Sequence, residues 1–294
     1  MAHQGPRTGD GGDADSHRQG GGGDGGRPPG PTRPANRPRA GRIRPFRSHG
    51  HRGRPVIRTV WAYVVILGAT LYSGGRAILY YFLWPRHFQR CADRLTGEWA
   101  SIILWGAGTR LVVRNGGRLG RGRGQILVSN HQSWFDIFAL GTALRDRFSF
   151  VGKKELSRIP VVGAAWERVG NIAIDRSDQQ AAIDSLKRAD DLMREGRTII
   201  MFPEGTRSPT GEMGRFKKGA FVMAIKSQVP VLPVAIVGTR RIMEKGSWRM
   251  SSGTATVIVG DPIDTTGFTL RDRNRLSREC REAIEGLLNG AGEL

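Results

Sequence analysis

Short apolar runs alternate along the chain with stretches whose apolar residues recur at helical spacing. Short continuous apolar runs are typical of buried strands, and they lie at 111–113, 126–128, 148–151, 172–174, 198–202, 231–237 and 254–259. Helical periodicity predicts helices at 89–107, 179–195, 219–227 and 271–288. Because strands alternate with helices, the pattern predicts an α/β domain in which helices flank a mixed sheet.

Two further apolar runs precede this alternation. They cover 60–72 and 77–84, and Ser73-Gly74-Gly75-Arg76 separates them. Neither reaches the length of about 20 apolar residues that a membrane-spanning helix needs, and aromatic residues flank both, as in interfacial anchors. We therefore expect a membrane-associated helical segment at 56–88, made of two short helices. One kinked span and a buried hairpin of the globular domain are the alternatives.

The first 55 residues differ in composition from the remainder. They contain 14 of the 42 glycines and 8 of the 15 prolines, with 11 arginines against 4 aspartates. A segment with so few apolar side chains cannot form a core and is predicted to be disordered. The predicted organisation is thus a tail at 1–55, the membrane-associated segment at 56–88 and a folded domain at 89–294.

The charge balance indicates an anionic partner. The chain has 46 Lys and Arg against 26 Asp and Glu, a net charge of +20, which suits nucleic acid, an anionic membrane or a phosphorylated substrate. Positive charge on both sides of the apolar segment predicts a location on the cytoplasmic face of the inner membrane. The two cysteines, Cys91 and Cys280, are predicted to be unpaired, as is usual in a reducing compartment.

His131 and Asp136 form the first candidate for a catalytic site. His131 follows the strand at 126–128, and Ser133 with Asp136 has the S-x-x-D form of a helix start. On one continuous helix, residues five apart would point about 140° apart and would not meet. In a turn that precedes a helix, Asp136 would fix the tautomer of His131 and leave the second ring nitrogen as a general base. The alternative is that Asp136 only caps the helix and His131 is a surface residue.

A second candidate site follows the strand at 198–202, in the segment Pro203-Glu204-Gly205-Thr206-Arg207-Ser208. Gly205 allows unusual backbone angles and the close approach of a ligand, and Arg207 offers a planar fork of donors suited to phosphate. Other cations lie before or after it in the chain: Lys153, Lys154, Arg215, Lys217 and Lys218. Cations gathered at strand ends predict a phosphate pocket.

Four blocks of sequence, in this order, resemble the motifs of the glycerolipid acyltransferases. Asn130-His131 through Asp136 is similar to their H-x4-D motif, and 170–176, 202–208 and 229–234 resemble the three blocks that follow it. Lys153-Lys154-Glu155-Leu156 and 159–163 are similar to the 1-acyl-sn-glycerol-3-phosphate acyltransferase branch. The H-x4-D motif alone is weak evidence, whereas four blocks in order are specific.

The resemblance implies transfer of a fatty acyl group from acyl-CoA or acyl-carrier protein to the 2-hydroxyl of 1-acyl-sn-glycerol 3-phosphate (lysophosphatidate), giving phosphatidate. It implies the fold of that family and direct general-base catalysis by His131 and Asp136. It also implies substrate-binding roles for Lys153, Glu204, Gly205, Thr206 and Arg207. We expect membrane lipids as partners and no specific nucleic acid. We expect no cofactor, and no metal, because two ligands without a third make a poor site.

Two other functions remain open at this point. The same catalytic groups would serve the acylation of a different lysolipid, such as a lyso-ornithine lipid. The charge and the arginine-rich tail would also suit a non-catalytic protein that binds membranes or RNA. The intact His131, Asp136, Glu204 and Arg207 argue against a lapsed active site. A covalent acyl-enzyme is not supported, because the chain has no G-x-S-x-G elbow and neither cysteine lies in a motif.

Overall fold

The structure is a computed structural model in which residues 55–119, 122, 124–144, 147–154, 166, 168–174 and 179–292 are described. The predicted disordered tail therefore lies outside the described residues, except for its last residue, Pro55. The motif residues 155–163 and 175–176 lie outside them as well.

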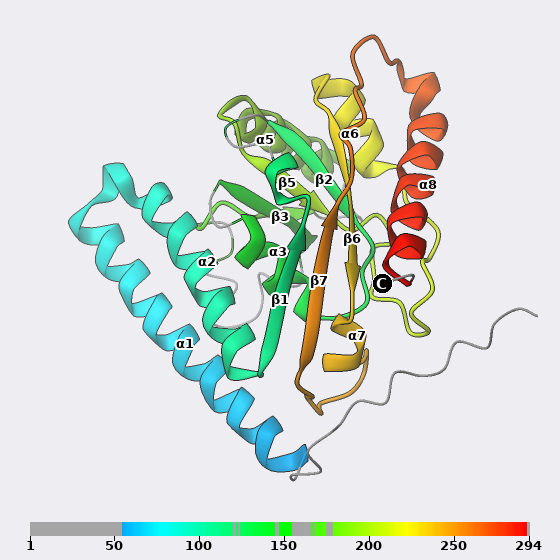
Figure 1. Cartoon of the computed structure of the whole chain (residues 1–294). Coiled ribbons are helices and arrows are strands. Elements are labelled where there is room, and N and C mark those ends of the chain that lie inside the picture. Colours follow the sequence, from blue (N-terminus) through cyan, green and yellow to red (C-terminus); the bar gives the residue numbers. More distant parts are fainter. Residues whose placement is uncertain are drawn as a thin grey trace, which may run out of the picture. The chain divides into compact units, whose positions relative to one another are not determined.

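A seven-stranded mixed sheet forms the centre of the domain (Figure 1), in the order β1-β7-β6-β2-β5-β3-β4. Neighbouring strands are parallel except for β6 and β7, which are antiparallel. The prediction of a mixed sheet is confirmed, and all seven predicted strands are present. They are β1 (Thr109–Arg114), β2 (Gln125–Ser129), β3 (Phe148–Lys153), β4 (Ile172–Ile174), β5 (Thr198–Met201), β6 (Val231–Val237) and β7 (Gly253–Val259).

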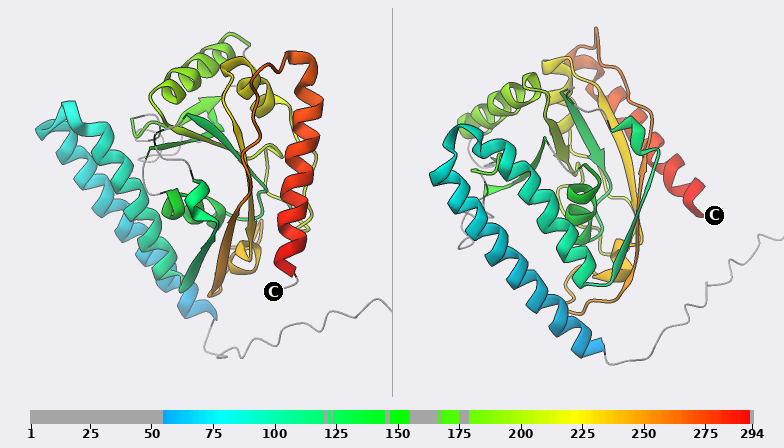
Figure 2. Two further views of the ribbon diagram at one scale, coloured as in Figure 1. Left: turned by 45° about the horizontal axis from the view of Figure 1, so that its top comes forward. Right: turned by 60° about the vertical axis from the view of Figure 1, so that its left-hand side comes forward.

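Helices cover both faces of this sheet (Figures 1 and 2). One face packs against α2 (Phe88–Gly106), α3 (Phe135–Leu144) and α7 (Thr239–Ile242), and the other against α5 (Gln179–Arg194), α6 (Gly219–Ser227) and α8 (Arg273–Gly292). On the first side, α1 (Pro55–Leu83) packs mainly against α2. Side chains of a strand alternate between faces. In β2, Leu127 belongs to the first core, whereas Ile126 and Val128 belong to the second. Short 3-10 helices lie at Pro85–His87, Gly116–Arg118 and Leu270–Asp272.

The N-terminal apolar segment corrects the sequence prediction. α1 is one continuous helix, so the expected break at Ser73-Gly74-Gly75-Arg76 does not occur. The helix that packs beside α1 is α2 (Figure 2). Trp99 Nε1 of α2 donates a hydrogen bond of 3.1 Å to Thr70 Oγ1 of α1. Packing of this kind overrides the low helix propensity of glycine, which costs about 1 kcal/mol per residue.

The two faces of α1 have different environments. Thr59, Ala62 and Ala69 are buried against the domain, and the Met250 N–H donates to Thr59 Oγ1 over 3.1 Å. The opposite face is apolar and exposed, and includes Val60, Trp61, Val64, Leu67, Leu71, Ile78, Leu79 and Phe82. The helix at Val56–Leu83 is long and apolar enough to cross a membrane, and only 22% of its apolar 18-residue stretch is buried. α1 is therefore both part of the core and an unusually apolar surface.

Candidate active site

The first site residue lies where the central strand β2 ends. Asn130 follows β2, and its side chain forms two hydrogen bonds with Ile236 of β6: Nδ2 donates to the carbonyl oxygen over 2.9 Å, and Oδ1 accepts from the N–H over 2.8 Å. The amide side chain thus replaces the strand ladder at the point where the backbone leaves the sheet. His131 comes next, at the start of the turn that leads to α3.

His131 and Asp136 are in direct contact. His131 Nδ1 and Asp136 Oδ2 are 2.8 Å apart, and Oδ2 also accepts from the N–H groups of Gln132 over 2.6 Å and Ser133 over 2.8 Å. Asp136 is fully buried, whereas the His131 side chain is 13% exposed. The same oxygen of Asp136 therefore caps the turn before α3 and contacts the imidazole. The predicted folding back of His131 onto the first helical turn is present.

The contact determines which ring nitrogen is available. An ionised carboxylate only accepts hydrogen bonds, so Nδ1 carries the proton and Nε2 keeps a lone pair. No other described residue forms a hydrogen bond with the His131 ring. The ring of Phe202 stacks on the imidazole, with centroids 4.0 Å apart and an angle of 15° between the planes. The imidazole is thus fixed by one polar contact and one flat apolar contact.

Glu204 connects the second motif to the first. One carboxylate oxygen accepts from the His131 N–H and the other from the Gly214 N–H, each over 2.8 Å. Burial raises the pKa of Glu204, and these two hydrogen bonds oppose that rise. The Ser208 N–H in turn donates to the His131 carbonyl oxygen over 2.7 Å. Both backbone polar groups of His131 are therefore bound by the segment that follows β5.

A tight turn that ends at Gly205 lies beside this contact, and Thr206 and Arg207 follow it. Gly205 has φ +72°, a conformation that favours glycine, and its N–H donates to the Phe202 carbonyl oxygen over 3.0 Å. The Arg207 guanidinium carbon lies 4.9 Å from the centre of the Trp134 ring, a cation–π contact. Partial burial lowers the pKa of Arg207, and the charge of Asp136 opposes this. Arg207 remains a cation at neutral pH, because an arginine in a protein is effectively always protonated.

The segment that follows β6 also contacts the two motifs, which the sequence did not predict. Ser133 Oγ donates to the Met243 carbonyl oxygen over 2.7 Å, and Lys245 Nζ donates to Thr206 Oγ1 over 3.3 Å. The predicted motifs end before this segment. The only sequence signal is the basic pair Arg240-Arg241 after an apolar strand, which is too common to identify a site. Tertiary contact brings Lys245 to the second motif.

The structure brings most of the predicted site residues together. His131, Asp136 and Glu204 are joined by direct contacts, and Thr206 and Arg207 follow the adjacent turn. The backbone of Lys153 ends β3, but its side chain lies outside the described residues.

Cys91 and Cys280 are free, as predicted, and burial raises the pKa of the Cys280 thiol to about 12. That thiol is therefore protonated at neutral pH and is a packing residue.

Known proteins resemble this chain in both sequence and structure. The Acyltransferase family model matches residues 110–237, a range that includes both motifs. The chain is 32% identical over 217 residues to a 1-acyl-sn-glycerol-3-phosphate acyltransferase of Pseudomonas aeruginosa, which covers 72% of this chain and 82% of that protein. It is 34% identical over 202 residues to the human beta enzyme of the same name, covering 68% and 73%.

Similarity to longer relatives is more local. The chloroplastic 1-acyl-sn-glycerol-3-phosphate acyltransferase BAT2 of Brassica napus is 42% identical over 139 residues, which are 47% of this chain and 40% of that protein. The chain thus matches about two fifths of the length of such chloroplastic relatives. The crystal structure of the 1-acyl-sn-glycerophosphate acyltransferase PlsC from Thermotoga maritima superimposes with a TM-score of 0.71 and 27% identity. It covers 81% of this chain and 96% of the other.

Proposed function

Because the chain belongs to the family of 1-acyl-sn-glycerol-3-phosphate acyltransferases, we propose that it transfers a fatty acyl group to the 2-hydroxyl of lysophosphatidate and forms phosphatidate. The proposed donor is the thioester of coenzyme A or of acyl-carrier protein. Support comes from two relatives of this name that match the chain over most of their own length. It also comes from the contact between His131 and Asp136. That contact is the single observation on which the chemistry rests.

The proposed mechanism is direct general-base catalysis. His131 Nε2 accepts the proton of the acceptor hydroxyl while the hydroxyl oxygen attacks the thioester carbonyl carbon. The carbon–sulfur bond then breaks, and the leaving thiolate receives the proton from the imidazolium. Asp136 fixes the tautomer and stabilises the imidazolium between these steps. The mechanism uses no metal and no cofactor.

Charge on the thioester oxygen requires donors in the transition state. The Gly205 N–H is unavailable, since it already donates to Phe202. The next two amides along the chain, those of Thr206 and Arg207, form no hydrogen bond with any described residue. We assign the oxyanion-stabilising role to these two N–H groups.

The acceptor phosphate is proposed to bind beside the turn at Gly205. A phosphate monoester carries a charge of about −1.5 to −2 at neutral pH, so more than one cation is expected. Arg207 is the first candidate, and the family resemblance adds Lys153. Lys245 is a third candidate, because its ammonium group contacts Thr206 next to Arg207. Glu204 has a supporting role, since both of its oxygens are already bound to backbone N–H groups.

The exposed apolar face of α1 is proposed to bind the membrane that contains the acceptor. Leu67 and Leu71 lie one turn apart on this face and are 62% and 63% exposed. Burial of two such side chains contributes about 3 kcal/mol or more. Leu67→Ser with Leu71→Ser should therefore weaken binding to phospholipid vesicles at least about tenfold. Leu270→Ser, at an exposed leucine outside α1, is the control. Equal binding of both variants would contradict membrane binding through α1.

The proposed activity is tested by assaying the purified full chain with lysophosphatidate in mixed micelles and radiolabelled palmitoyl-CoA or palmitoyl-acyl-carrier protein. Formation of labelled phosphatidate, dependent on the acceptor, is the expected result. Lysophosphatidylcholine and a lyso-ornithine lipid serve as competing acceptors. Turnover of either one in preference to lysophosphatidate would contradict the proposed acceptor.

A further inference from the structure

A second cationic surface lies on the other side of the segment that follows β5. It is a groove of about 680 Å³ between this segment and α8, a size within the range of ligand sites. The segment contributes Arg215, Phe216 and Lys218. Lys218 is the residue before α6, and no side chain caps the N-terminus of that helix. The first amide groups of α6 therefore add positive potential to one end of the groove.

The facing wall comes from one side of α8. Asn274, Ser277, Arg278 and Arg281 line the groove, at the spacing i, i+3, i+4 and i+7 that places residues on one helix face. The opposite face of α8 is buried through Leu276, Cys280 and Ile284. The groove thus contains four cations and two neutral hydrogen-bonding side chains, and no acidic residue lines it within the described part of the chain.

The cations differ in their partners. Arg281 is fixed: its guanidinium donates to the carbonyl oxygens of Gly214 and Met213 over 2.6 and 3.0 Å and pairs with Glu285 at 2.9 Å. The side chains of Arg215, Lys218 and Arg278 are exposed and have no hydrogen bond or ion pair with any described residue. Three like charges are thus gathered around one groove without a protein counter-charge, which favours a polyanionic ligand.

The groove is connected to the catalytic residues through one peptide group. The Gly214 carbonyl oxygen accepts from Arg281 of the groove, while the Gly214 N–H donates to Glu204. Glu204 in turn contacts the His131 backbone. A ligand in the groove would therefore be close enough for a flexible arm to reach His131 across this segment.

The position of the groove in the fold indicates what kind of ligand it binds. α6 and α8 cover one face of the sheet, and the apolar helix α1 lies on the other (Figures 1 and 2). An anionic membrane bound to α1 would contact the other side of the domain. A water-soluble anion can reach the groove while the lipid acceptor is bound from the membrane side.

We infer that this groove binds the phosphates of the acyl donor, with the donor being coenzyme A: its 3′-phosphate and pyrophosphate contact Arg215, Lys218 and Arg278. The inference rests on the proposed function for the identity of the donor. Asn274 and Ser277 provide neutral hydrogen-bonding groups in the same wall. The pantetheine arm then crosses the segment near Gly214 and brings the thioester to His131.

The test compares two pairs of substitutions in the full chain. Lys218→Gln with Arg278→Gln removes two groove cations. Lys226→Gln with Arg271→Gln removes the same charge from exposed residues of the same region that do not line the groove. For each protein we would measure the binding of coenzyme A and of 3′-dephospho-coenzyme A by calorimetry. We would also measure the KM values for palmitoyl-CoA, palmitoyl-acyl-carrier protein and lysophosphatidate.

The groove variant should bind coenzyme A about tenfold more weakly, as expected when charge-assisted contacts are lost, and lose its preference over the dephospho form. Its KM for palmitoyl-CoA should rise similarly, with the KM for lysophosphatidate unchanged and the control like wild type. Unchanged coenzyme A affinity would overturn the inference, as would an effect confined to palmitoyl-acyl-carrier protein or to lysophosphatidate. If coenzyme A binds through the groove but lysophosphatidate is not acylated, the proposed function fails and the groove assignment stands.

Discussion

Two hydrogen-bonded pairs of side chains have almost the same length but occur in different regions of the molecule. His131 and Asp136 are 2.8 Å apart in the turn before α3, and Arg76 and Glu98 are 2.7 Å apart between α1 and α2. Their surroundings differ. Asp136 is fully buried and the His131 side chain is 13% exposed, whereas Arg76 and Glu98 are 29% and 51% exposed. The distance alone therefore does not distinguish the proposed catalytic pair from a surface pair.

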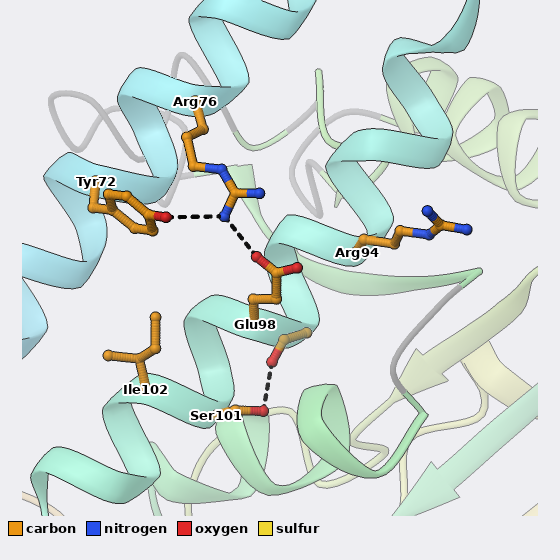
Figure 3. Close-up of a pocket in the computed structure, with 7 residues that line it drawn as sticks. Tyr72, Arg76, Arg94, Glu98, Ser101 and Ile102 are labelled. Atoms are coloured by element: carbon orange, nitrogen blue, oxygen red, sulfur yellow. Dashed lines mark hydrogen bonds and ion pairs between the residues drawn. The ribbon is translucent and has the colours of Figure 1, made fainter.

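The difference lies in what else binds each group. Asp136 Oδ2 receives two backbone N–H groups in addition to the imidazole, and these donors have fixed positions. Arg76 instead donates to the side-chain hydroxyl groups of Tyr80 and Tyr72, at 3.3 and 3.5 Å. Arg76 and Glu98 line an open pocket of about 500 Å³. Figure 3 shows the two side chains meeting between the helices, with Arg94 pointing away from them. Fixed donors and burial make the first pair suitable for chemistry.

The largest expected effect is that of His131→Ala on turnover. Loss of the general base should lower kcat by about 10²–10⁴-fold. No other described side chain is placed to replace the imidazole as the base. Steady-state kinetics measure it, and circular dichroism with thermal unfolding verifies that the variant is folded. Near-normal turnover by folded protein would exclude His131 as the base.

Asp136→Asn should separate charge from geometry at the same pair. Oδ1 of Asp136 is buried and forms no hydrogen bond with a described residue, so an asparagine can place its amide nitrogen there and keep an oxygen for the three donors. Turnover should still fall by about 10²-fold or more, because a neutral amide stabilises an imidazolium less than a carboxylate does. A variant that keeps its stability and its turnover would show that the charge is unnecessary.

A third pair extends the comparison to a buried contact without a chemical role. Arg197 before β5 and Asp93 of α2 form two hydrogen bonds of 2.9 and 2.8 Å, and their side chains are 4% and 6% exposed. Asp93→Ala leaves the guanidinium buried without its counter-charge. The free energy of unfolding should fall by about 3–5 kcal/mol, measured by urea denaturation. A loss of less than about 1 kcal/mol would mean that burial does not determine the strength of such a pair.

Glu204→Gln should change the pH dependence of stability. Burial raises the pKa of Glu204 above its ordinary value, so the folded protein binds this proton more tightly than the unfolded chain does. The contribution to stability is fully present below the unfolded pKa and is lost as pH rises through the folded pKa. Urea denaturation between pH 4 and pH 7 should therefore show a smaller fall in stability for the glutamine variant. Identical pH profiles would contradict the raised pKa.

The smallest effect is expected at the exposed pair. Glu98→Gln should change the free energy of unfolding by no more than about 1 kcal/mol and leave turnover unchanged, because exposed ion pairs contribute little. The measurement is the same urea denaturation, at low and high salt. A loss comparable to that of Asp93→Ala would show that this pair is an essential link between α1 and α2.

Local patterns determined much of this protein. The apolar runs predicted all seven strands. The H-x4-D spacing favoured a contact between His131 and Asp136 but left open that Asp136 only caps the helix, and the structure shows both the cap and the contact. Arg207 was proposed from its fork of donors after an apolar strand and Glu204 from resemblance to a family motif, and both lie in one short contiguous segment. Composition predicted that the first 55 residues form a separate tail, and this stays a prediction because residues 1–54 lie outside the described part of the chain.

Only the tertiary structure decided the features that depend on distant residues. Glu204 contacts the backbone of His131 across 73 positions of the chain, and Lys245 reaches Thr206 across 39. α1 continues through Gly74 and Gly75 because α2 packs along it, and the antiparallel pairing of β6 and β7 depends on sheet assembly. Periodicity reports only which face of an element is apolar. The partner of that face is chosen when the elements pack together.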